Sequence, residues 1–352
     1  MAEQPRVIAR MLEEKTTEDL PDFSGEQVPD SLLTSCESVC IIACGSAMHA
    51  GLAGQFLMKK FLHIPVSVEM ASEFMYTDPV VDEKTLVIAV SQSGETIDTL
   101  EALKYAKQKG AGSLAVINVK GSSIARESDA VLYTNAGPEI AVASTKAYTS
   151  QLALFALLVA RMAYVRGDFT ETETRDFVRE LKRVPDAMEK VLAGKEKIHH
   201  IAGRIISAKD IFMIGRGLDY FIAMEGSLKL KEVSYIHSEA YASGELKHGP
   251  LALITEHTPV VAVATQKQLL SKEVSNIREV RSRGADVVLF AKEQLMPEEE
   301  EGYLTFELPD VRDEFMCLPA AAALQLLAYY VSSDKGYDVD KPRNLAKVVT
   351  VE

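Results

Sequence analysis

The sequence predicts two α/β domains, each a doubly wound three-layer sandwich with helices on both faces of a parallel sheet. Short apolar runs bounded by Gly or Ser alternate with helix-like patterns, which is typical of buried parallel strands. The same succession of elements returns about 170 residues later. The length of 352 residues also exceeds that of one typical hydrophobic core, so two domains are expected.

The first domain contains the apolar runs that we expect to be its buried strands. These runs are 39–44, 85–90, 113–119 and 130–134. After the second run, apolar residues continue at helical spacing from Gly94 to Gly110, and glycine is a typical helix stop. A strand, a turn that contains glycine and a helix therefore follow one another here.

The second domain repeats this order. Segment 210–232 parallels 38–60, 259–265 parallels the strand before Ser91, and 286–292 parallels 113–119. Between the two copies, a polar helical stretch at 169–203 is expected to carry the boundary. The predicted limits are 1–170 for the first domain, 171–200 for a helical connection, 201–335 for the second domain and 336–352 for a tail.

Two segments near the end of the chain are expected to lack regular structure. The run "PEEEE" at 297–301 is predicted to be a solvated loop. The tail from residue 336 lacks helical periodicity and follows an apolar helix at 318–331. A polar C-terminal segment is usually frayed, but the β-branched ending "KVVTVE" is more apolar than a solvated tail needs.

Composition and charge exclude several function classes. The net charge of −13 argues against broad binding of nucleic acids or anionic membranes. The three cysteines Cys36, Cys40 and Cys44 are spaced unlike a zinc site, and neither a metal nor another cofactor is expected. No signal peptide is evident, and the longest apolar run contains Arg161 and is too short to cross a membrane. We therefore predict a cytoplasmic protein.

The turn Ser91-Gln92-Ser93-Gly94-Glu95-Thr96 is the strongest functional signal in the sequence. It ends a strand and opens a helix, so backbone N–H groups and hydroxyls gather at the positive end of a helix dipole. Such a turn can hold a phosphate without Lys or Arg. The alternative is that one serine simply caps the helix, which needs only one hydroxyl.

The residues of this turn resemble the phosphate-binding signature of sugar isomerase (SIS) domains, which bind phosphosugars. The wider resemblance is to the isomerase half of the glutamine–fructose-6-phosphate aminotransferases. It covers nearly the whole chain and is carried by "ACGSAMHAG" (43–51), 135–152, 225–254 and "DVDKPRNLAKVVTVE" (338–352). The resemblance implies conversion of fructose 6-phosphate to glucosamine 6-phosphate through a Schiff base.

The resemblance implies two groups of substrate-binding residues. The phosphate is held by Ser91, Gln92, Ser93 and Thr96, with the turn Cys44-Gly45-Ser46 contributing from the next strand. The sugar is contacted by Val142, through its backbone, and by Ala346. One departure is Ala47, where the family usually has a second hydroxyl. Without the family, the segment around Val142 is equally well a Ser/Thr-rich loop leading into a helix at 151.

The resemblance also implies catalytic roles for four residues. Glu232 is the general base that moves a proton between C1 and C2, and Lys229 steadies the developing negative charge. His248 opens the sugar ring from the adjacent subunit of a homodimer, and Lys347 forms the Schiff base. Without the family, the spacing of Glu225, Lys229 and Glu232 is most often that of a salt-bridged stripe on a helix surface.

Three other functions remain open at this point. The chain could be a stand-alone SIS deaminase of amino-sugar phosphates, or a non-catalytic phosphosugar sensor. A nucleotide-binding Rossmann protein is less well supported, because "GRG" at 215–217 lacks the G-x-G-x-x-G pattern. Residues 1–15 lead directly into the isomerase-like region, so we expect an isomerase domain whose glutaminase partner domain belongs to the full-length protein.

Overall fold

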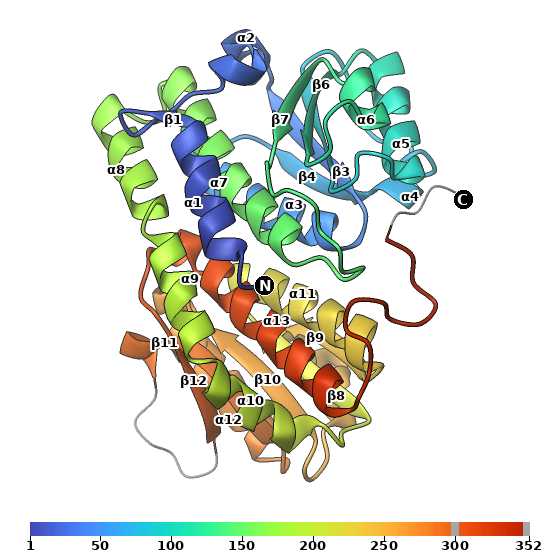
Figure 1. Ribbon diagram of the computed structural model, residues 1–352, viewed down its shortest axis with the longest axis vertical. Coiled ribbons are helices and arrows are strands. Elements are labelled where there is room, and N and C mark those ends of the chain that lie inside the picture. The colour runs from blue at the N-terminus through green and yellow to red at the C-terminus, as the bar shows by residue number, and fades with distance from the viewer. Residues whose placement is uncertain (297–302, 348–352) are drawn as a thin grey trace. The chain divides into compact units, whose positions relative to one another are not determined.

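The chain divides into two compact units, each built around one parallel sheet (Figure 1). The computed structural model describes residues 1–296 and 303–347, so the loop predicted at 297–301 lies outside this range. The first-sheet unit comprises Glu3–Glu139, Lys146–Arg183 and the chain from Ala346 onward. The second-sheet unit comprises Met1–Ala2, Ile140–Thr145 and Val184–Leu345.

The first sheet has five parallel strands in the order β4-β3-β5-β6-β7. Their bounds are β3 Ser38–Ala43, β4 Val66–Met70, β5 Thr85–Ser91, β6 Gly112–Ile117 and β7 Ala130–Tyr133. Four of these strands were predicted from the sequence, and β4 was not. This edge strand is only partly buried and alternates apolar with polar residues, so it lacks a continuous apolar run.

Helices cover both faces of the first sheet (Figure 1). Consecutive strand residues point to opposite faces, and both Ile41 and Ile42 are fully buried. Ile42 packs in a core with Leu103 of α5, while Ile41 lies against Gly51 of α3. The helices of this unit are α1 Gln4–Glu14, α2 Asp30–Thr34, α3 Gly45–Leu62, α4 Ala71–Phe74, α5 Ile97–Gln108, α6 Ser123–Glu127, α7 Lys146–Arg166 and α8 Glu171–Leu181. A two-stranded antiparallel ribbon, β1 Thr16–Thr17 and β2 Leu20–Pro21, completes it.

The second sheet repeats this architecture, with five parallel strands in the order β12-β11-β10-β8-β9. Their bounds are β8 Asp210–Gly215, β9 His237–Ala242, β10 Pro259–Ala264, β11 Asp286–Lys292 and β12 Tyr303–Leu308. The helices are α9 Val184–Ala193, α10 Lys195–Ile205, α11 Leu218–Ser234, α12 Leu270–Arg281 and α13 Cys317–Asp334. One face carries α12, through Ile277, and the other carries α11, where Gly226 lies against Met213. The prediction of two doubly wound α/β sandwiches is therefore confirmed.

Two helices of the described residues have the length and composition that a membrane span requires, Lys146–Arg166 and Asp313–Asp334. In the most apolar 18-residue stretch of each helix, 83% and 89% of the residues, respectively, are buried within the protein. This burial is typical of the core helices of a folded domain.

Candidate active site

Strand order places two of the predicted turns side by side at the carboxyl edge of the first sheet. The strand that follows β3 in the chain, β4, lies on one side of β3 in the sheet, and β5 lies on its other side. Ala43 of β3 pairs with Val90 of β5, so both strands end at the same level. Ligands of open α/β sheets bind at such a switch point, outside the carboxyl ends of the strands. The turns that begin at Cys44 and Ser91 meet this condition.

The turn after β5 is held by its own hydroxyl groups. The Ser91 and Thr96 hydroxyls lie 2.9 Å apart, and Ser91 Oγ accepts a hydrogen bond of 3.0 Å from the Gly94 N–H. Ser93 Oγ accepts a hydrogen bond of 3.1 Å from the Glu95 N–H. These hydrogen bonds fix the shape of the turn and gather its hydroxyls on one loop.

The hydroxyls of this turn do not cap α5. Thr96 is the residue that precedes the helix, and its side chain makes no capping hydrogen bond. The first N–H groups of a helix have no partner within the helix, so the start of α5 can still bind an anion. This geometry favours the phosphate interpretation over the simple capping alternative.

The neighbouring turn after β3 also leaves a helix start open. Cys44 precedes α3 without a capping hydrogen bond, and Gly45 has a φ of +55° with nothing within 4 Å of where a Cβ would lie. Burial raises the pKa of the Cys44 thiol, so this side chain brings no negative charge. Ala47 lies in the first turn of α3 and supplies no hydroxyl.

The corresponding switch point of the second sheet is filled by the chain itself. There the carboxylate of Asp219, on α11, accepts hydrogen bonds from the Thr265 N–H at 2.7 Å and from the Thr265 hydroxyl at 2.5 Å. Burial raises the pKa of Asp219 to about 7. A protein carboxyl group thus takes the donors that an anionic ligand would need, and the two copies of the fold are not equivalent.

Helix α11 carries Glu225, Lys229 and Glu232, the three charged residues that the sequence analysis singled out. Lys229 Nζ lies 2.5 Å from Glu232 Oε2 and 3.4 Å from Glu225 Oε1. The side chains of Lys229 and Glu225 are 3% and 1% exposed, and that of Glu232 is 21% exposed. A salt-bridged surface stripe is therefore the wrong description of these residues. Burial by itself would lower the pKa of Lys229, but the two carboxylates raise it above its usual value, so the ammonium stays charged.

His248 lies at the end of a short 3-10 turn, Ser243–His248, that follows β9. Its side chain is exposed. The base of this turn is fixed, because the buried Ser243 hydroxyl donates a 2.7 Å hydrogen bond to Glu273. Burial raises the pKa of Glu273 to about 7. An exposed imidazole on an anchored turn is free to meet a ligand.

The segment around Val142 is hydrogen-bonded to the C-terminal tail. The Val142 N–H donates a 3.0 Å hydrogen bond to the Asp340 carbonyl, so a sugar contact through this backbone would use the carbonyl of Val142. The helix that follows begins at Lys146, five residues earlier than expected. The Arg343 N–H donates to the Tyr235 hydroxyl at 2.9 Å, and its guanidinium lies 4.2 Å from the Tyr235 ring centroid. Up to Lys347, therefore, the tail is mostly exposed but is anchored to the second-sheet unit by these contacts of Asp340 and Arg343.

Lys347 contacts a carboxylate that sequence reasoning missed. Its Nζ lies 3.5 Å from Glu139 Oε2, and the Glu139 side chain is only 3% exposed. Ala346, just before it, is exposed. The signal in the sequence was weak, since Glu139 is a single acid in the loop "NAGPEIAVAS". The contact places a buried acid beside the lysine that the resemblance assigns to the Schiff base.

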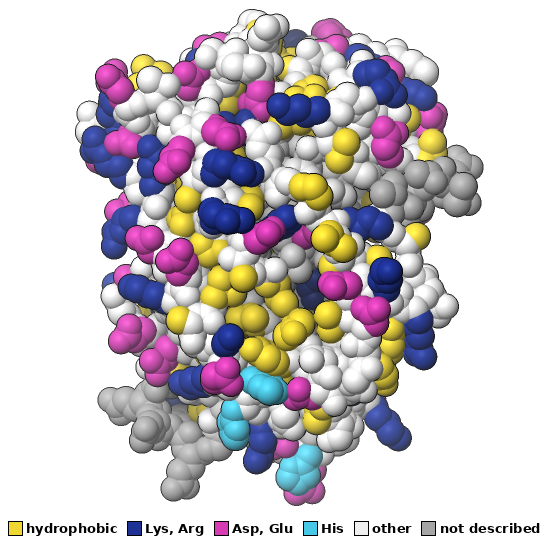
Figure 2. All heavy atoms as spheres, viewed as in Figure 1, with side chains coloured by type: hydrophobic (Ala, Val, Ile, Leu, Met, Phe, Trp, Pro, Cys, Tyr) yellow, Lys and Arg dark blue, Asp and Glu magenta, His cyan; other side chains and the backbone are white. Residues whose placement is uncertain are grey.

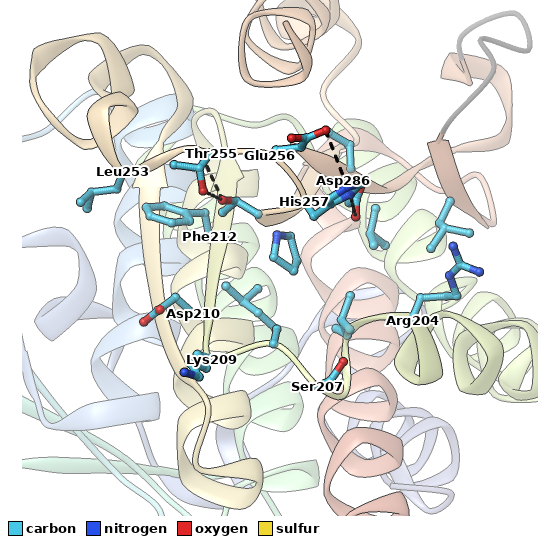
Figure 3. A pocket seen from close by; sticks show the side chains of 18 of the residues that line it. Arg204, Ser207, Lys209, Asp210, Phe212, Leu253, Thr255, Glu256, His257 and Asp286 are labelled. Carbon is cyan, nitrogen blue, oxygen red and sulfur yellow. Dashed lines mark hydrogen bonds and ion pairs between the residues drawn. The ribbon is translucent and has the colours of Figure 1, made fainter. Parts of the chain in front are cut away.

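A larger cavity of about 870 Å³ lies elsewhere in the second-sheet unit (Figure 3). It is lined by the residues that begin the strands, including Asp210 of β8 and Asp286 of β11. This is the amino edge of the sheet, opposite the edge at which ligands of this fold bind. Figure 3 shows His257 beside Asp286, and the two side chains are 3.3 Å apart. Its lining carries four acids, Asp210, Glu239, Glu256 and Asp286, against Arg204 and Lys209, so the cavity does not favour an anionic ligand such as a phosphate.

Neither a patch of one charge on the face shown in Figure 2 nor a cluster of metal ligands among the described residues offers a second candidate site. Figure 2 shows basic and acidic side chains interspersed over the visible face of the molecule. Within 1–296 and 303–347, no three His, Cys, Asp or Glu side chains are grouped as a metal ion would require.

Comparison with known proteins places this geometry in a family. The SIS domain model matches residues 32–161 and 204–332, which are the two sheet-bearing regions. The chain is 52% identical over 320 residues to glutamine–fructose-6-phosphate aminotransferase (isomerizing) of Caldanaerobacter subterraneus subsp. tengcongensis; the match covers 91% of this chain and 53% of that protein. It is 49% identical to the Clostridium tetani protein of the same name, over 99% of this chain and 58% of that protein. The chain thus spans little more than half the length of these relatives.

A solved structure matches over nearly the whole chain. The C-terminal domain of glucosamine-fructose-6-phosphate aminotransferase from Francisella tularensis superposes with a TM-score of 0.93 at 38% identity, covering 97% of this chain and 96% of that one. From the two SIS matches and this superposition together, we conclude that the chain belongs to the SIS domain family and is a relative of the C-terminal domain of these aminotransferases.

Proposed function

We propose that this chain is the isomerase portion of a glutamine–fructose-6-phosphate aminotransferase and converts fructose 6-phosphate to glucosamine 6-phosphate. The observation that carries the proposal is the pair of uncapped helix starts at the switch point of the first sheet, one of them lined by hydroxyls. This is a site for a phosphate group in a chain with a net charge of −13. The names of the relatives supply the sugar.

Binding is proposed to begin with the phosphate. Ser91, Gln92, Ser93 and Thr96 donate to its oxygens together with the N–H groups that open α5, and Cys44-Gly45-Ser46 contribute from the adjacent turn. The sugar then meets the carbonyl of Val142 and the backbone of Ala346. The open space in front of Gly45 lets a phosphate approach the backbone closely.

The chemistry is proposed to proceed through an imine. His248 moves the proton that opens the ring, and the neutral Lys347 amine adds to C2 with loss of water. Ammonia, supplied by a glutaminase domain of the full-length protein, then replaces the lysine. Glu232 takes a proton from C1 and returns it to C2, while the charged Lys229 stabilises the intermediate. The sum is fructose 6-phosphate plus ammonia giving glucosamine 6-phosphate and water.

The proposal extends to assembly and location. An exposed His248 suits a homodimer in which this residue completes the site of the other subunit. The domain limits and the cytoplasmic location predicted from the sequence belong to the same proposal.

Proton exchange in D₂O tests the proposed reaction. With fructose 6-phosphate, the wild type should incorporate deuterium at C1, observed by NMR, and form glucose 6-phosphate. E232Q should lose about 10²- to 10⁴-fold in the exchange rate while still binding the sugar. E225Q removes the other carboxylate that contacts Lys229 and should keep measurable exchange.

Three results would refute the proposal. Equal exchange by E232Q and the wild type would remove Glu232 as the base. Release of ammonia from glucosamine 6-phosphate as the main reaction, with no exchange of fructose 6-phosphate, would identify a deaminase instead. Sugar binding without either reaction would identify a phosphosugar sensor.

A further inference from the structure

A second, smaller cavity of about 310 Å³ lies in the second-sheet unit, next to the buried charges of α11. Its lining comes from α11, α13, the segment after Ile140, the tail and Met1. The lining residues are Met1, Ala141, Ala143, Thr145, Lys229, Val233, Gln325, Ala328, Tyr329, Val339 and Asp340. Its volume suits a small molecule of about the size of a hexose.

This cavity coincides with part of the proposed sugar site. Lys229 lines it, and so do Ala141 and Ala143 on either side of Val142. Both Lys229 and Val142 were assigned to the sugar on grounds that did not involve the cavity. Beside the cavity, the hydrogen bond from the Val142 N–H to the Asp340 carbonyl links the segment after Ile140 to the tail.

Gln325, on α13, is the unexplained polar residue of the cavity. It is 3% exposed. Its Nε2 donates a 3.4 Å hydrogen bond to the Thr145 carbonyl, and because only an N–H can donate there, the orientation of the amide is fixed. The Oε1 atom is then a buried acceptor to which nothing in 1–296 and 303–347 donates. Buried acceptors are nearly always satisfied, because leaving one unpaired is unfavourable.

Lys229 does not satisfy this acceptor in the structure. Its ammonium is taken up by the carboxylates of Glu225 and Glu232 on its own helix. A ligand that satisfies Gln325 must therefore bring its own donor. Carbonyl and phosphate oxygens only accept hydrogen bonds, whereas a sugar hydroxyl can donate one.

We propose that Gln325 is a further substrate-contacting residue, whose Oε1 accepts a hydrogen bond from one hydroxyl of the sugar bound beside Lys229. This inference rests on the proposed function. It assigns Gln325 a role in specificity: sugar phosphates that lack that hydroxyl leave the amide unpaired and bind more weakly.

The test measures binding of fructose 6-phosphate and of its 3-, 4- and 5-deoxy analogues by calorimetry. Q325M keeps the bulk of the side chain and removes the acceptor, and it should weaken fructose 6-phosphate binding about 3- to 10-fold, the worth of one neutral hydrogen bond. For one deoxy analogue, Q325M and the wild type should bind equally.

The matched control is Q151M. Gln151 is a glutamine of α7 that is 2% exposed and lies outside this cavity, so its replacement reports the effect of losing a buried amide elsewhere. Q151M should reproduce any change in melting temperature but should not change the order of affinity among the analogues.

The outcomes separate this inference from the proposed function. If the wild type binds no fructose 6-phosphate, the proposed function fails and the inference fails with it. If the wild type binds and Q325M binds equally well, only the inference is overturned, and the amide is satisfied by water. A uniform loss for all analogues, shared by Q151M, would show that Gln325 only supports the fold.

Discussion

Replacing Gly94 with alanine should damage both the stability of the protein and its affinity for phosphate. Gly94 has a φ of +68°, a conformation that costs an alanine about 1–2 kcal/mol. An added Cβ would also lie 2.0 Å from Ser122 Oγ and 2.6 Å from Ser122 Cβ. Overpacking of this kind costs typically ~1–3 kcal/mol, so the free energy of unfolding should fall by roughly 2–5 kcal/mol in total.

The clash cannot be relieved without moving the turn after β5. Ser122 is buried, and the residues after it are tied to the turn. The Ile124 N–H donates to the Gly94 carbonyl at 3.0 Å, and the Ser123 N–H donates to the Glu95 carboxylate at 2.8 Å. Hydrogen bonds from Ser123 lower the pKa of Glu95, so its carboxylate stays ionised and keeps accepting these hydrogen bonds. We therefore expect G94A to displace the hydroxyls of Ser91 and Ser93.

Gly121 provides a matched control. Its φ is +70°, but nothing lies within 4 Å of where its Cβ would be. The free energy of unfolding of G121A should therefore fall only by about 1–2 kcal/mol, the cost of the left-handed conformation for an alanine. Its affinity for fructose 6-phosphate should be unchanged. In the double variant G94A/S122G the clashing atoms are gone, so its loss should be smaller than that of G94A.

Urea denaturation and calorimetric titration with fructose 6-phosphate measure the two effects. The expected result is that G94A is less stable than G121A and binds the sugar phosphate at least 10-fold more weakly. If G94A and G121A behave alike, the packing argument is wrong. If G94A is destabilised but binds normally, the turn after β5 is not the phosphate site.

Three further predictions concern the proposed site, its assembly and the switch point of the second sheet. A47S should restore one phosphate hydrogen bond and tighten fructose 6-phosphate binding about 2- to 10-fold in calorimetry, whereas unchanged affinity would show that the position is not used. Mixing inactive H248A with inactive K347A should regenerate activity through mixed dimers that hold one intact site, and a mixture that stays inactive would exclude a site shared between subunits. Burial raises the pKa of Asp219 from 3.8 to about 7, so folded protein retains a proton that unfolded protein releases, and stability should fall as pH rises from about 4 to 7. D219N should flatten this slope in urea denaturation at several pH values; an unchanged slope would show that Asp219 does not titrate in this range.

The central strands could be predicted from the sequence because they are buried on both faces. Strands such as β5 and β10 are continuous apolar runs, and no tertiary information is needed to recognise them. The strands β9 and β12 were not predicted. They lie at the edges of the second sheet, where polar residues are tolerated and the apolar run is interrupted.

The environment of the site residues could not be predicted in the same way. Glu225 and Lys229 have the spacing of a surface ion pair, and they are buried because α13 packs over α11. The contact between Glu139 and Lys347 joins residues that are far apart in the chain, and no local pattern reports it. The role of Asp219 at the second switch point likewise depends on Thr265 in a different element.

The most direct test of the whole account is reductive trapping of the imine. Cyanoborohydride added to the protein with fructose 6-phosphate should reduce the Schiff base and leave a hexose phosphate on one lysine. Peptide mass spectrometry should find this adduct on Lys347, and free phosphate or a disrupted turn in G94A should reduce its yield. An adduct on another lysine, or none at all at a concentration where the sugar binds, would contradict the account.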